Sequence, residues 1–166
     1  MGSVEEFNAL PTARAEADLI ACCAAPRWAY LIAAGRPYPD LPALLAAADA
    51  ASRALTWPDV ALALAAHPRI GQRAAGPSTG AAWSRQEQAA VGTAADEVRA
   101  ALAEGNRAYE ERFGHVFLIR ADGRSAEEML AALRERLGND PGAERRAVAE
   151  ELRQITRLRL ERLLRP

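Results

Sequence analysis

The spacing of apolar residues is the feature that most constrains the fold of this chain. Along most of its length, alanine, leucine, valine and isoleucine recur at steps of three and four, which is the period of one face of an α-helix. One apolar run departs from this pattern, HVFLIRAD at 115–122, and we predict a strand or an extended loop there. The sequence therefore predicts an all-α fold, a helical bundle.

Glycine, proline and helix-capping residues divide the pattern into segments. A turn is expected at GRPYPD (35–40) and a glycine-rich loop at 71–80. We find no internal repeat, low-complexity linker or shift in composition, so residues 1–166 are expected to form a single domain. Helices are predicted over 12–24, 27–34, 41–55, 58–66, 84–104 or on to 113, 125–137 and 142–164.

Composition narrows the possible partners and chemistry. Half of the 166 residues are hydrophobic, about a quarter are charged, and the net charge is −1. No basic stripe is present, so neither nucleic acid nor a membrane is expected as a partner. The chain contains no lysine, which excludes a Schiff-base mechanism. Cys22 and Cys23 are adjacent and apolar in context, so we predict buried core residues, no disulfide framework and no metal site.

The ends of the sequence suggest a cytoplasmic protein. The segment MGSVEEFNAL lacks the basic and apolar regions of a signal peptide, and the terminal LRP is not a peroxisomal signal. No uncharged apolar run is long enough to cross a bilayer.

Three polar residues occupy positions where the helical pattern places core residues. His67 follows Val60 and Leu64, Glu87 precedes Val91, Ala94, Val98 and Leu102, and Arg159 lies among Val148, Leu152, Ile155 and Leu163. Charged side chains are rarely buried unless they are paired, because desolvation is costly. Three such exceptions suggest that the side chains share one water-restricted pocket.

Each of the three also has a structural interpretation. His67 could be a hydrogen-bonded residue at the end of a helix, where Pro68 disfavours helical geometry. Glu87 could close a capping box that begins with Ser84 as the N-cap residue. Arg159 could extend its stem along the core and reach water. Helical phase alone does not name a reaction.

Other conspicuous features have ordinary explanations. We interpret Trp28, Tyr30, Trp57 and Trp83 as core or rim aromatics, and ERRAVAEELRQ (144–154) as a solvated helix face. GPSTG lacks the lysine and spacing of a phosphate-binding loop. His115 is expected to be structural rather than catalytic.

Four motifs together resemble one family. HPRIG at 67–71, SRQEQAAV at 84–91, NRAYEERFGHVFLI at 106–119 and ITRLRLERLL at 155–164 are similar to segments of the 2-oxo-4-hydroxy-4-carboxy-5-ureidoimidazoline (OHCU) decarboxylases. The resemblance covers nearly the whole chain in the expected order. It implies an all-α fold specific to the family, no metal or organic cofactor, commonly a homodimer, and the decarboxylation of OHCU to (S)-allantoin in urate catabolism.

The resemblance also implies a set of site residues. By motif, the catalytic residues are His67, Glu87 and Arg159, the same three that helical phase selected. Positions that match ligand-contacting stretches of the family are Pro68, Ser84, Arg85, Gln86, Gln88, Phe117, Leu118, Ile119, Arg120 and Ala121. His115-Val116 departs from the aromatic-proline pair that many relatives carry after RFG.

These residues suggest roles in the decarboxylation. His67 is expected to be the general acid and base, favoured as the imidazolium by a helix C-terminus. Glu87, ionised at a helix N-terminus, would orient His67 or bind the ureido group, and Arg159 would bind a substrate oxygen. The peptide groups of 117–121 would bind the ring amides. Two alternatives stay open: a non-catalytic helical ligand-binding or interaction module that keeps the pocket, and an enzyme acting on another ureido compound.

Overall fold

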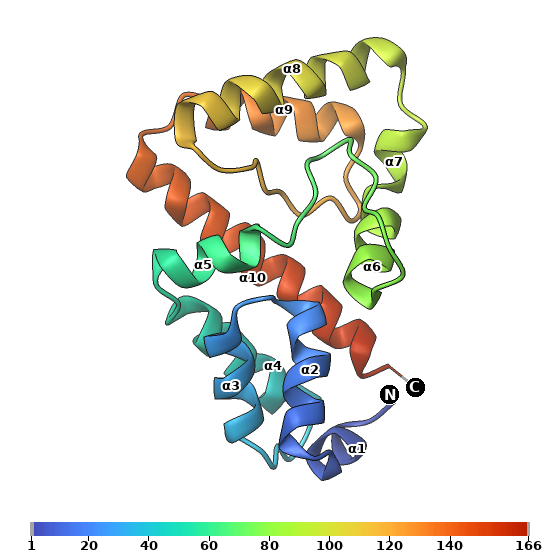
Figure 1. Ribbon diagram of the computed structural model, residues 1–166, viewed down its shortest axis with the longest axis vertical. Coiled ribbons are helices and arrows are strands. Elements are labelled where there is room, and N and C mark those ends of the chain that lie inside the picture. The colour runs from blue at the N-terminus through green and yellow to red at the C-terminus, as the bar shows by residue number, and fades with distance from the viewer. Residues whose placement is uncertain (1, 166) are drawn as a thin grey trace. The chain divides into compact units, whose positions relative to one another are not determined.

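The computed structural model describes residues 2–165, and ten helices account for most of them. No strand occurs within these residues, which confirms the prediction of an all-α fold. Their bounds are α1 Val4–Ala9, α2 Thr12–Cys22, α3 Pro26–Ala34, α4 Leu41–Arg53, α5 Trp57–Leu64, α6 Thr79–Glu87, α7 Ala89–Gly92, α8 Asp96–Phe113, α9 Ala126–Arg136 and α10 Pro141–Leu163 (Figure 1). None of the helices in the described range is both long and apolar enough to cross a bilayer.

The helices group into two compact units. The first contains residues 2–63 and 152–165, and the second contains 64–151, so α10 contributes its first half to the second unit and its second half to the first. That the chain is one domain stays a prediction.

In the first unit, α3 packs against both α2 and α4 (Figure 1). Trp28 of α3 is completely buried, and its indole N–H donates to the Ala48 carbonyl of α4 at 3.2 Å. Cys22 and Cys23 are both buried and unbonded to each other, which confirms their prediction as core residues. Tyr30, by contrast, is 61% exposed, so it is not a core residue.

In the second unit, α8 and α9 lie alongside each other (Figure 1). Their apolar faces and the 117–121 segment form one core. Its largest fully buried members include Tyr109, Phe117, Met129 and Leu133. Residues 116–121 belong to no helix or strand, so of the two predicted alternatives, a strand or a loop, the structure has the loop.

The predicted long helix from 84 was wrong, because the structure divides this stretch into three helices. Ser78, rather than Ser84, is the N-cap residue of α6, and its hydroxyl accepts from the Ala81 N–H at 3.1 Å. A break follows α7, where Gly92 and Thr93 are weak helix formers. α8 then starts with Asp96 and Glu97, whose charges suit a helix N-terminus. The expected loop 71–80 accordingly ends at Ser78.

Candidate active site

His67 lies just beyond α5, in the stretch that joins α5 to α6. The helix ends at Leu64, and the His67 N–H donates to the Leu64 carbonyl at 3.0 Å before the chain turns away at Pro68. The prediction that Pro68 ends the helix agrees with this geometry, although the last helical residue comes earlier than expected. Both His67 and Pro68 are half-buried. Because the helix dipole acts mainly within the last turn, it gives less support to an imidazolium than the sequence suggested.

The SRQEQ motif occupies the end of α6, not its beginning. Ser84 is buried inside the helix, and Glu87 is its last residue, half-buried. The predicted capping box between them is therefore wrong, and so is the argument that a helix N-terminus stabilises the Glu87 carboxylate. The break between α7 and α8 also separates Glu87 from the apolar series that continues to Leu102. Helical phase is thus no argument for Glu87, and its proposed role depends on the motif alone.

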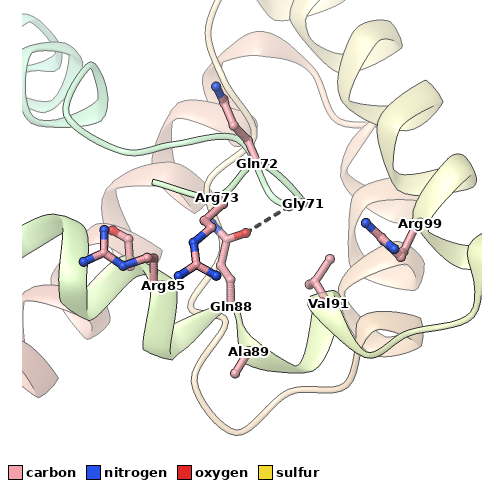
Figure 2. Close-up of a pocket in the computed structure, with 10 residues that line it drawn as sticks. Gly71, Gln72, Arg73, Arg85, Gln88, Ala89, Val91 and Arg99 are labelled. Carbon is pink, nitrogen blue, oxygen red and sulfur yellow. Dashed lines mark hydrogen bonds between the residues drawn. The ribbon is translucent and has the colours of Figure 1, made fainter. Parts of the chain in front are cut away.

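Part of the predicted substrate-binding set surrounds a cavity of about 370 Å³ within the second unit (Figure 2). Three of the predicted residues line this cavity: Ser84 and Arg85 near the end of α6, and Gln88 directly after it. Of the described residues that line it, three are arginines and none is acidic, so the cavity suits an anionic small molecule. The remaining lining residues are Gly71, Gln72, Arg73, Ala89, Val91, Gly92 and Arg99.

Gln88 and Arg85 bind the backbone of the loop 69–76 between α5 and α6. The Gln88 amide oxygen accepts from the Gly71 N–H at 2.9 Å (Figure 2). The Gln88 amide nitrogen donates to the Arg69 carbonyl at 3.4 Å. Arg85 donates through one guanidinium nitrogen to the carbonyls of Ala74 and Gly76, both at 3.0 Å. Sequence reasoning assigned both residues to substrate binding. The structure gives each of them, in addition, a loop-fixing role.

The other predicted binding residues do not line this cavity. Gln86 is exposed. In the 117–121 segment, Phe117, Leu118, Ile119 and Ala121 are buried. The Leu118 carbonyl accepts from Arg136 at 2.7 Å, and the Arg120 N–H donates to Glu151 at 3.1 Å. This carbonyl and this N–H are engaged within the protein, and hydrogen bonds from the segment to substrate stay a prediction.

Arg159 lies on the part of α10 that belongs to the first unit. Only 5% of the residue is exposed, which confirms the burial that helical phase predicted. Its guanidinium donates to the Ala21 carbonyl at 3.4 Å. Burial raises the pKa of the neighbouring Cys22 thiol to about 12, and the Arg159 charge opposes this rise. A pocket shared by Arg159, His67 and Glu87 stays a prediction.

Sequence reasoning missed a buried polar network in the second unit. Glu144 is fully buried, and its Oε1 accepts from the Arg136 Nε and Nη2 at 2.9 and 2.6 Å and from the Tyr109 hydroxyl at 2.5 Å. Burial and the hydrogen bond to Glu144 raise the pKa of Tyr109 well above its usual range. The interpretation of 144–154 as a solvated face is thus wrong for Glu144. A signal existed, since Glu144 lies one helical turn before Val148.

His115 packs in an aromatic cluster with Tyr109 and Phe113, with ring centroids 5.5 and 6.1 Å away. Its Nδ1 lies 3.0 Å from the Val116 carbonyl oxygen. These contacts support the structural role expected for this residue. Within residues 2–165 no group of three or more histidine, cysteine, aspartate or glutamate residues is placed to hold a metal ion.

Comparison with solved structures defines the class of protein. A crystal structure of an OHCU decarboxylase determined in the presence of (S)-allantoin superposes with a TM-score of 0.73 at 33% identity, over 88% of this chain and 96% of that one. A family model described as OHCU decarboxylase matches residues 8–161. The chain belongs to the OHCU decarboxylase family.

Further relatives share this fold or sequence. An (S)-allantoin synthase structure has a TM-score of 0.72 at 20% identity, covering 98% of this chain and 54% of that one, and shows the fold alone. The uric acid degradation bifunctional protein TTL of Arabidopsis thaliana is 33% identical over 86% of this chain and 45% of its own length. A 2-oxo-4-hydroxy-4-carboxy-5-ureidoimidazoline decarboxylase of Amia calva is 38% identical over 59% of this chain and 57% of its own. The chain spans about half the length of these two curated relatives.

Proposed function

We propose that this protein decarboxylates 2-oxo-4-hydroxy-4-carboxy-5-ureidoimidazoline to (S)-allantoin and CO2 as a step of urate catabolism. The observation that carries this proposal is the family match over residues 8–161. It is supported by the 33% identical OHCU decarboxylase whose structure was determined in the presence of (S)-allantoin. The three residues assigned to catalysis, His67, Glu87 and Arg159, are all present in the sequence.

His67 is the proposed general acid and base. When the bond to the carboxylate breaks, CO2 leaves and the electron pair enters the imine-like ring, which serves as the electron sink without a metal or an organic cofactor. A proton must then reach the carbon on one face to give the (S) product. An imidazole can hold and deliver that proton near neutral pH, and positioned proton transfer contributes about 10²–10⁴-fold in rate.

Glu87 and Arg159 have supporting roles in this proposal. Glu87 orients His67 or accepts hydrogen bonds from the ureido N–H groups. Arg159 binds a carbonyl or carboxylate oxygen through its planar guanidinium, and its burial supports a strong charge-assisted contact. The cavity beside Ser84, Arg85 and Gln88 supports an anionic substrate, because arginines line it and acidic side chains do not. We further propose that the protein is a cytoplasmic homodimer.

The test generates the unstable substrate enzymatically from urate and follows optical activity by circular dichroism. Wild-type protein should form (S)-allantoin much faster than the spontaneous reaction, which gives the racemate. His67→Asn should abolish this acceleration, whereas His115→Asn, a matched change at the other histidine of the chain, should retain turnover. An absence of acceleration by the wild type would refute the activity. Binding of (S)-allantoin without turnover would support the non-catalytic alternative.

A further inference from the structure

The loop that carries His67 is held mainly by side chains from other elements. Among the described residues, the backbone of 67–77 makes hydrogen bonds with backbone groups through two N–H donors, those of His67 and Gln72. Side chains supply the other attachments. Gln88 bonds to Arg69 and Gly71, and the Arg69 guanidinium pairs with Glu110 through two hydrogen bonds, at 2.6 and 3.1 Å. The backbone that follows His67 is therefore held in place largely by a few side-chain contacts.

Asn106 makes the most deeply buried of these contacts. It lies on α8, it is 4% exposed, and its Nδ2 donates to the Ile70 carbonyl at 2.8 Å. The Ile70 side chain is itself part of the apolar core of the second unit. One hydrogen bond and one apolar anchor thus fix the backbone three residues after His67. Pro68, between them, further limits backbone motion because its ring restricts φ.

The energetics of Asn106 do not favour a purely stabilising role. Its Oδ1 is buried and has no hydrogen-bond partner among the described residues. A buried unsatisfied polar atom costs about 1–3 kcal/mol, whereas one neutral hydrogen bond contributes only about 0.5–1.5 kcal/mol. A leucine of similar shape would remove the unpaired Oδ1 but would leave the buried Ile70 carbonyl without its donor, so the two costs roughly offset each other. The amide at this position is better explained by the geometry that its hydrogen bond imposes on the loop.

We propose that Asn106 is a positioning residue for His67, acting through the Ile70 carbonyl. Its kinetic consequence rests on the proposed function, because it assumes that His67 is the general acid and base. A displacement of about 1 Å in a reacting group can lower a rate about 10²-fold. Loss of the Asn106 hydrogen bond should accordingly slow turnover while leaving substrate affinity and overall stability nearly unchanged.

The experiment compares Asn106→Leu with the wild type by steady-state kinetics, thermal unfolding and NMR of the histidine rings. The chain has two histidines, so the two Cε1–H signals are simple to assign. We expect kcat to fall at least about 10-fold, KM to stay within about 2-fold, and the His67 signal to shift or broaden. His115 contacts Tyr109 of α8, so an unchanged His115 signal shows that α8 itself is intact.

Asn139→Leu is the matched control. Asn139 also lies in the second unit, and its replacement removes one side-chain hydrogen bond, the one to Glu144 at 3.1 Å. That bond holds no part of the loop 67–77. It should leave kcat and the His67 signal unchanged. If Asn106→Leu does not fold, Asn106→Ala, which adds no volume, takes its place.

The outcomes separate this proposal from the proposed function. Unchanged kcat or an unchanged His67 signal in the Asn106 variant would overturn the positioning role, as would a loss of kcat that only parallels a loss of stability. A wild-type protein without decarboxylase activity would refute the proposed function. In that case the shift of the His67 signal alone decides whether Asn106 positions this side chain.

Discussion

Replacing Arg136 with methionine should be among the most destabilising single changes in the second unit. Arg136 and Glu144 form a buried ion pair, with side chains 10% and 0% exposed. Methionine retains much of the apolar stem but removes both hydrogen bonds to the carboxylate and the bond to the Leu118 carbonyl. Tyr109 and Asn139 remain as neutral donors to Glu144. They cannot replace the lost positive charge.

The expected magnitude follows from the burial of the pair. Removing one partner of a buried ion pair costs about 3–5 kcal/mol, since the other charge is left uncompensated. For a protein of this size each 1 kcal/mol shifts Tm by about 2–4 °C, so Arg136→Met should lower Tm by about 6–20 °C. Urea unfolding followed by circular dichroism at the helical minimum measures the free energy directly.

Three further variants make the result specific to burial: Arg14→Met, Glu144→Leu and the double variant Arg136→Met/Glu144→Leu. Arg14→Met breaks an exposed pair with Asp18, where Arg14 is 68% exposed, and should cost less than about 0.5 kcal/mol. The double variant Arg136→Met/Glu144→Leu removes both charges, so its loss should be smaller than the sum of the single losses by at least about 2 kcal/mol. A loss below about 1 kcal/mol for Arg136→Met, or additive losses in the double variant, would show that this buried ion pair contributes little to stability.

Three other changes test separate parts of the structure. Arg159→Lys should raise KM in the coupled urate assay, because lysine lacks the planar fork, and an unchanged KM would argue against substrate binding by Arg159. Burial raises the pKa of the Cys22 thiol from 9.0 to about 12 on folding. Between pH 9 and 12 the unfolded chain loses this proton while the folded chain keeps it, so the free energy of unfolding falls as pH rises through this range. Cys22→Ala should therefore make the free energy of unfolding fall less steeply with pH, by about 1.4 kcal/mol per pH unit, when urea unfolding is measured between pH 9 and 12. Equal dependence on pH in the variant and the wild type would contradict the raised pKa of Cys22. Arg85→Met removes the hydrogen bonds to the carbonyls of Ala74 and Gly76. If these bonds stabilise the loop by about 1 kcal/mol, trypsin should cleave it at Arg73 about 5-fold faster in the variant. An unchanged cleavage rate would mean that Arg85 does not hold the loop.

Local patterns predicted most helices well. Helices α2, α3, α4, α9 and α10 begin and end within a few residues of the expected bounds, because apolar periodicity and capping residues act over one or two turns. Helix α1 was not predicted, and a further error came at Ser84, where a capping-box pattern was present but the helix had already started at Thr79. Two serines, Ser78 and Ser84, offered alternative N-caps, and the sequence pattern alone did not distinguish them.

The helical class, the family motifs and the burial of Arg159 could be predicted from the sequence, since each depends on residue types at short or fixed spacings. The partners of the buried polar groups, in contrast, depend on how the helices pack. Glu144 lies in the same apolar series as Val148, yet its burial is possible because Arg136 and Tyr109 reach it from other helices. Likewise, Asn106 and Gln88 hold the loop after His67 from 17 to 36 residues away along the chain. Pairings over such separations depend on how helices pack, and helical periodicity carries no information about them.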